Sequence, residues 1–262
     1  MMRAGKTAAV LALGAGCLAI AASLAGAELV EHGDLFVSFS GGIAPNALPR
    51  RALAPISVSV SGRVRTLSGD RPPALRRIAI ELNRGGHLDT RGLPACRRAQ
   101  IEASSSRQAL TACGPALIGT GTYTASTAFP EQAAFPTAGR ILAFNARLHG
   151  HPAILAHVYG TDPVPITRII TFQISHARGT YGTVLTGALP ASINRWGYVR
   201  RISLSLHRRF TYRGRPRSYL SAACAAPPGF PGAVFPFARA SMTFADGRTL
   251  ASTLTRSCKV RG

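Results

Sequence analysis

Residues 219–258 read YLSAACAAPPGFPGAVFPFARASMTFADGRTLASTLTRSC, and this stretch decides the fold. It opens with a strand that carries Cys224, crosses a loop rich in proline and glycine, and ends in a hairpin whose last strand carries Cys258. Apolar residues at every second position of the hairpin are typical of strands with one buried face. The stretch therefore predicts antiparallel β structure held by a disulfide.

The register of this hairpin follows from its apolar positions. A two-residue turn would place the apolar residues of the two strands on opposite faces. A three-residue loop at 245–247 instead pairs Met242 with Leu250 and Ala238 with Leu254, so that both apolar sets share one face. We therefore expect the three-residue loop, with its final glycine at positive φ.

Residues 1–27 have the pattern of a secretory signal peptide. Arg3 and Lys6 precede an uncharged apolar run, and the sequence AGA at 25–27 provides an A-x-A cleavage site. Two alternatives stay open: a retained membrane anchor, because the run is nearly long enough to span a bilayer, and a lipid anchor on Cys17. We expect a secreted or cell-envelope protein with no transmembrane segment after cleavage.

Four cysteines follow this segment: Cys96, Cys113, Cys224 and Cys258. An even number in an exported chain indicates two disulfides, for which three connectivities exist. Proximity in sequence favours Cys96–Cys113 and Cys224–Cys258, and the hairpin register places Cys258 on the core side. Metal ligation is the alternative, but the chain has no C-x-x-C pair and no histidine at ligand spacing from a cysteine.

Residues 28–262 read as a single β-rich domain. About a dozen short strands separated by turn residues predict a β-sandwich-like fold in one or two packed lobes. The clearest strands are 56–61 and 75–82, and the first is 34–40, which we expect Gly41 and Gly42 to end. A candidate lobe boundary lies near 129–139, where prolines punctuate the chain.

One short helix is predicted at 97–112. This segment contains no glycine or proline and fits no period of two, and Gly114-Pro115 follows it. Cys96 and Cys113 flank it, so a disulfide between them would fasten the helix to the sheet.

The basic character of the chain concentrates in residues 195–217. The formal net charge is +21, and only Lys6 and Lys259 among the 31 basic residues are lysines. Guanidinium groups bind carboxylate, sulfate and phosphate in a bidentate manner, and aromatic residues are interleaved with the arginines. We predict an anion-binding surface formed by eight arginines: Arg195, Arg200, Arg201, Arg208, Arg209, Arg213, Arg215 and Arg217. A solvated strand face in an arginine-rich proteome is the alternative interpretation.

An anionic envelope polymer or an acidic polysaccharide is the partner that this surface favours. Nucleic acid shares the electrostatic pattern, but the export signal argues against it. We therefore expect a non-enzymatic extracellular or cell-envelope protein that binds anionic polymer.

The alternative function is that of a secreted hydrolase with an unrecognised site. The sequence contains no G-x-S-x-G, H-E-x-x-H or S-x-x-K motif. It indicates no cofactor, because the G-x-G at 119–121 lacks the third glycine of a dinucleotide site. His149, His151 and His157 lie in one predicted hairpin, but no acidic residue nearby completes a metal site, so we expect no metal.

Six segments spread over the mature chain carry a family resemblance: ALPR at 47–50, RPPALRRIAIELNRGG at 71–86, GLPAC at 92–96, ACGPALIGTG at 112–121, LAFNAR at 142–147 and SYLSAACAAPPGFPGAVFPFARASMTFADGRTL at 218–250. In these segments the chain resembles a family of uncharacterised exported proteins from high-GC Gram-positive bacteria. The resemblance implies export and one shared architecture. It implies no activity, ligand or site.

Overall fold

The computed structural model describes residues 27–191 and 196–261. The predicted signal-peptide segment before residue 27, the lipidation alternative at Cys17 and the candidate residue Arg195 lie outside the described residues. The strands of the N-terminal part are β1 (Glu28–His32), β2 (Leu35–Ala44), β3 (Ala47–Leu48), β4 (Ala54–Pro55), β5 (Ser57–Thr66), β6 (Leu75–Asn83) and β7 (Gly86–Leu88).

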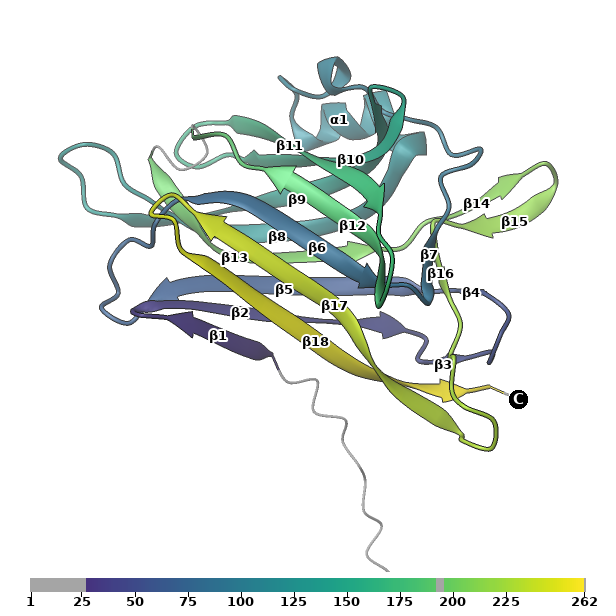
Figure 1. Cartoon of the computed structure of the whole chain (residues 1–262). Coiled ribbons are helices and arrows are strands. Elements are labelled where there is room, and N and C mark those ends of the chain that lie inside the picture. The colour runs from purple at the N-terminus through teal and green to yellow at the C-terminus, as the bar shows by residue number, and fades with distance from the viewer. Residues whose placement is uncertain (1–26, 192–195, 262) are drawn as a thin grey trace, which may run out of the picture.

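A helical segment follows, and the described elements after it are all strands (Figure 1). The helical elements are η1 (Arg98–Gln100), α1 (Ser106–Cys113) and η2 (Gly114–Ala116). The later strands are β8 (Leu117–Thr127), β9 (Phe135–Leu148), β10 (His151–Gly160), β11 (Ile166–His176), β12 (Tyr181–Ala188), β13 (Gly197–Leu206), β14 (Arg209–Tyr212), β15 (Arg215–Ser218), β16 (Leu220–Ala222), β17 (Gly232–Phe244) and β18 (Thr249–Val260).

Thirteen strands form one curled sheet, in the order β1-β2-β5-β13-β8-β9-β10-β11-β12-β6-β17-β18-β3. Two smaller sheets, β4-β16-β7 and β14-β15, complete the strands. The mainly β architecture with one short, disulfide-flanked helix is therefore confirmed. In the part of the chain that the structure describes, no helix is long and apolar enough to cross a membrane.

Polar contacts hold the two ends of the curled sheet together. Arg248, next to the β17–β18 turn, reaches the β1–β2 turn, where its Nη1 lies 2.6 Å from Asp34 Oδ1. Its Nε lies 2.6 Å from Asp246 Oδ2 in its own turn. Farther along, the backbone N–H of Thr255 in β18 donates to Glu28 Oε1 at 3.2 Å. These contacts cover strand edges that would otherwise be open to pairing with other chains.

Two apolar clusters lie on opposite faces of β9 and β10. The larger fills the inside of the curl and includes Ala143 and Ile154. The smaller includes Leu142 and Phe144 and lies beneath α1 and the Cys96–Cys113 disulfide. The segment near 129–139, predicted as a candidate lobe boundary, holds the connection between the paired strands β8 and β9.

The predicted helix at 97–112 is too long. The structure has one 3₁₀ turn, then a break, and α1 begins only at Ser106. The backbone N–H of Gln108 donates to Ser105 Oγ at 3.3 Å, and Gln108 Oε1 accepts from the Ser105 N–H at 2.9 Å. This reciprocal pair is a capping box, so the serine starts a new helix instead of continuing an old one.

The predicted end of the first strand at Gly41 and Gly42 is wrong. β2 continues through both glycines to Ala44, and an additional strand, β1, precedes it. A Cβ at Gly41 would collide with the Ser59 carbonyl oxygen of the neighbouring strand β5. The glycine here permits close approach of two strands, which is its second common role in β structure. The strands predicted at 56–61 and 75–82 correspond to β5 and β6.

The C-terminal hairpin has the predicted register. Met242 lies opposite Leu250 and Ala238 opposite Leu254, and Gly247 has φ +86°. Both predicted disulfides are present, with Cα–Cα distances of 5.5 Å for Cys96–Cys113 and 5.7 Å for Cys224–Cys258. One detail differs, because Cys224 lies in the loop after β16 and not in a strand. Its N–H donates to the Pro49 carbonyl at 2.9 Å, so the cysteine is held in position although it belongs to no β-ladder.

Candidate anion-binding site

The β14–β15 hairpin presents one cationic, aromatic face. Tyr212 lies opposite Arg215 and Phe210 opposite Arg217, so these four side chains share a face of the hairpin. The two-residue turn has φ +51° at Arg213 and +70° at the following glycine, as in a type I′ turn. A positive φ is uncommon for arginine and costs conformational energy, so this position is not explained by turn chemistry alone.

The loop after β7 packs against this face. The Asp89 N–H donates to the Tyr219 carbonyl at 2.9 Å, which continues the pairing of β7 with β16. Three residues later Gly92 adopts φ +77°, and a Cβ at this position would overlap the ring of Tyr212. The loop therefore depends on a glycine to lie against the ring, and this approach brings Arg91 beside the hairpin.

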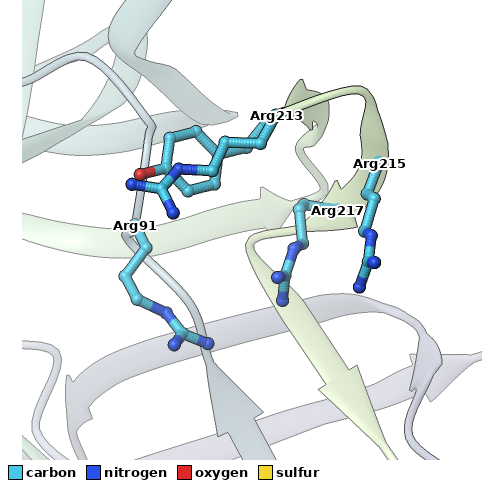
Figure 2. Close-up of a pocket in the computed structure, with 5 residues that line it drawn as sticks. Arg91, Arg213, Arg215 and Arg217 are labelled. Carbon is cyan, nitrogen blue, oxygen red and sulfur yellow. The ribbon is translucent and has the colours of Figure 1, made fainter.

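The loop and the hairpin enclose an open cavity of about 600 Å³, lined by Arg91, Tyr212, Arg213, Arg215 and Arg217. Figure 2 shows the guanidinium groups of Arg91, Arg215 and Arg217 pointing in the same direction, while Arg213 extends across toward the loop. The Arg213 guanidinium lies 5.3 Å from the centre of the Tyr212 ring, within cation–π range. A cavity of this size falls in the range of small-ligand sites.

Asp89 holds two of the four arginines in place. Arg91 Nε lies 3.1 Å from Asp89 Oδ1, and Arg217 Nη1 lies 3.4 Å from Asp89 Oδ2. Burial would raise the pKa of the Asp89 carboxyl, but the hydrogen bonds from Arg91 and the charges of both arginines hold that pKa below its ordinary value. The carboxylate is thus charged at neutral pH, and it neutralises only one of the four cations.

Three of the eight predicted arginines meet in this cavity: Arg213, Arg215 and Arg217. Sequence reasoning missed Arg91, which is separated from them by more than 100 residues and has no cluster of basic residues around it. Gly92 carries a signal in principle, because glycine is a common turn residue. That signal does not say which side chain the turn approaches.

Two further predicted arginines flank the hairpin without lining the cavity. Arg209 pairs with Ser218 and therefore belongs to the other face of the hairpin. Arg208 Nη2 donates to the Pro115 carbonyl at 3.3 Å, next to the helical segment. The hairpin thus divides its basic residues between two faces.

The remaining described candidates lie in β13. Arg201 is opposite Arg63 of β5, and Arg200 occupies a register shift between β13 and β8. Both side chains are exposed. They form part of a general basic surface, distinct from the cavity of Arg91 and the β14–β15 hairpin.

The three histidines do not come together as a metal site. His149 forms the β9–β10 turn with Gly150, whereas His157 is buried beneath the helical segment. His157 Nε2 lies 2.9 Å from the Ser104 carbonyl, which also accepts from Thr167 Oγ1 at 2.8 Å. Across residues 27–191 and 196–261, no three His, Cys, Asp or Glu side chains are placed to hold a metal ion.

Burial of His157 predicts an acid-dependent loss of stability. Burial lowers the pKa of this imidazole, and the hydrogen bond to Ser104 opposes the shift only in part. Below the ordinary histidine pKa of about 6.5, the unfolded chain binds a proton that the folded chain excludes. We therefore expect the free energy of unfolding to fall between pH 7.5 and pH 5, and His157→Gln to reduce that fall. Urea denaturation at both pH values measures it, with His151→Gln at an exposed strand position as the control.

Comparison of the chain with protein-family models, with curated proteins and with solved structures finds no match.

Proposed function

We propose that this is an exported, non-enzymatic protein of the cell envelope or extracellular space that binds an anionic polymer through the cavity of Arg91 and the β14–β15 hairpin. The observation that carries the proposal is that four arginines line one open cavity of about 600 Å³. The ligand is an acidic polysaccharide or an anionic envelope polymer.

The charge balance of the cavity supports an anionic ligand. Asp89 forms ion pairs with Arg91 and Arg217, so these two guanidinium groups are held in position before a ligand binds. The Arg215 side chain lines the cavity without a hydrogen bond or ion pair to any described residue, so its guanidinium donors are free for carboxylate, sulfate or phosphate. An arrangement with two fixed and two available cations reduces the ordering cost of binding.

The cavity favours binding over hydrolysis. Among the residues that the structure describes, none of those lining it is a histidine, cysteine or serine. The acid beside it, Asp89, is held ionised by Arg91 and Arg217 and does not serve as a proton donor at neutral pH. The two disulfides suit the oxidising compartments outside the cytoplasm, which supports an envelope polymer over nucleic acid.

Exchanging two cavity arginines tests the proposal. We expect Arg213→Gln/Arg215→Gln to weaken binding to polygalacturonate or to polyglycerol phosphate at least about tenfold at low salt, since each lost charged hydrogen bond contributes about 1.5–3 kcal/mol. Titration calorimetry at low and high salt measures the affinity, with neutral dextran as the uncharged probe.

The matched control is Arg76→Gln/Arg77→Gln, which removes the same charge from exposed positions in β6. Equal losses from both pairs would mean that net charge alone attracts the polymer. Failure of the unmodified protein to bind any anionic polymer at low salt would refute the proposal.

A further inference from the structure

A second surface exposes large apolar side chains. It lies at the end of the β17–β18 hairpin opposite the turn at 245–247, where β17 begins and β18 ends. Phe230 is 61% exposed, Val234 is 73% exposed and Leu53 is 53% exposed. We refer to these three residues as the tip patch. Single exposed apolar residues are common, so the patch is informative only if the structure fixes its side chains in position.

The loop that carries Phe230 is fixed to the body of the protein. Arg50 Nη1 donates to the carbonyls of Ala226 (2.6 Å) and Pro227 (2.5 Å), and its Nη2 donates to the Phe230 carbonyl at 3.0 Å. The Cys224–Cys258 disulfide closes the base of the loop. A loop held by a disulfide and three arginine hydrogen bonds presents Phe230 to solvent at little further entropic cost on binding.

The segment that carries Leu53 runs beside the start of this loop, because the Cys224 N–H donates to the Pro49 carbonyl at 2.9 Å and Ala54 pairs with Ala222. The Val260 N–H donates to the Pro231 carbonyl at 2.7 Å, which brings the end of β18 to the same place. Figure 1 shows the loop that enters β17 and the C-terminal end of β18 at one end of the molecule, with the β14–β15 hairpin projecting separately.

The segments that form the tip patch carry exposed cations and no acidic residues. Arg51, Lys259 and Arg261 are exposed, and Lys259 lies opposite Gly232 in the hairpin. The sequence has no Asp or Glu in 35–69, 220–245 or 247–262. Exposed apolar side chains with cations on the same segments are complementary to a lipid surface, which is apolar in its interior and anionic at its head groups.

We propose that the tip patch docks on an anionic lipid bilayer. Phe230, Val234 and Leu53 enter the boundary between head groups and acyl chains, and the cations on the same segments pair with the phosphates of the head groups. This surface is separate from the arginine cavity, so the protein has one site for a polymer and another for the membrane surface beside it.

A tryptophan placed at the tip reports docking directly. The native chain has one tryptophan, Trp196, so the variant Trp196→Phe/Phe230→Trp carries its only indole at the tip. We expect phosphatidylglycerol vesicles with brominated acyl chains to quench this indole and shift its emission to the blue, and phosphatidylcholine vesicles to leave it unchanged. The exported protein with native Trp196 is the control and stays unquenched.

Two substitutions separate the apolar and the charged contributions. Phe230→Ser is expected to lower vesicle partitioning roughly tenfold, and Arg51→Gln/Lys259→Gln roughly thirtyfold, whereas Arg76→Gln/Arg77→Gln has a much smaller effect. Binding of polygalacturonate by Phe230→Ser stays unchanged, and Arg213→Gln/Arg215→Gln keeps the tip quenching. The two proposals therefore fail independently.

Absence of quenching at position 230 with anionic vesicles would overturn the membrane proposal, even if the protein is retained on vesicles by other means. An emission shift that depends on protein concentration without vesicles would also overturn it, because the tip patch would then bind a second copy of the chain.

Discussion

Gly92→Ala is expected to destabilise the fold by about 3 kcal/mol and to abolish binding of anionic polymer at the arginine cavity. Two costs add at this position. Gly92 has φ +77°, where an L side chain costs about 1–2 kcal/mol. The new Cβ also overlaps the Tyr212 ring, and overpacking of this kind costs about 1–3 kcal/mol. Relief of the overlap moves either the loop or the ring, and both movements separate Arg91 from the hairpin.

Two controls divide these costs. Gly69 has φ +79° with no atom within 4 Å of an added Cβ, so Gly69→Ala measures the backbone cost alone, about 1 kcal/mol. Combining Gly92→Ala with Tyr212→Ala removes the overlap, and the cycle of single and double variants gives the coupling between the two residues. Urea denaturation and calorimetry with polygalacturonate are the measurements. If Gly92→Ala costs no more than Gly69→Ala, the packing of the loop on Tyr212 is not as described.

Removal of the Cys224–Cys258 disulfide has the largest expected effect on stability, about 4 kcal/mol. The bond closes a loop with a sequence separation of 34, against 17 for Cys96–Cys113. In the chain-entropy account the cost grows with the logarithm of loop length, which gives about 4 kcal/mol for Cys224→Ala/Cys258→Ala and about 3 kcal/mol for Cys96→Ala/Cys113→Ala. The longer bond also fastens the loop of Phe230 to the larger apolar cluster.

The local consequences of the two losses differ. Without Cys224–Cys258, limited proteolysis is expected to cleave within 225–231, because only hydrogen bonds, chiefly those of Arg50, then hold that loop. Without Cys96–Cys113, cleavage is expected near η1 and α1, where the smaller cluster loses its outer cover. Equal melting temperatures for the unmodified protein and the Cys224→Ala/Cys258→Ala variant would contradict the expected role of the bond.

The register of the C-terminal hairpin could be predicted from the sequence. Its register depends on a period of two and on the length of one turn, and both are local properties. The pairing of Met242 with Leu250 was predicted for this reason, and the two disulfides were predicted from the proximity of their cysteines in the sequence. The break at Ser105 was missed although it is local, because a serine can either continue a helix or cap a new one from an extended conformation, and residue order does not decide between the two.

The candidate site could be predicted from the sequence only in part. Arg213, Arg215 and Arg217 lie close together in the chain, so a basic stretch indicated them. Their meeting with Arg91 depends on β7 pairing with β16, and this pairing joins segments more than 100 residues apart. Alternation along a hairpin also divides its arginines between two faces, and a count of charges does not show that Arg209 faces away from Arg215.

Local periodicity, turn chemistry and the spacing of cysteines thus specify a β-rich, disulfide-linked chain with a basic segment before its last hairpin. The order of the thirteen strands, the contact of Arg248 with Asp34 that joins the ends of the sheet, and the cavity around Asp89 come from pairings between distant strands. Such pairings are set by the burial of many side chains at once, and no short window of sequence contains that information.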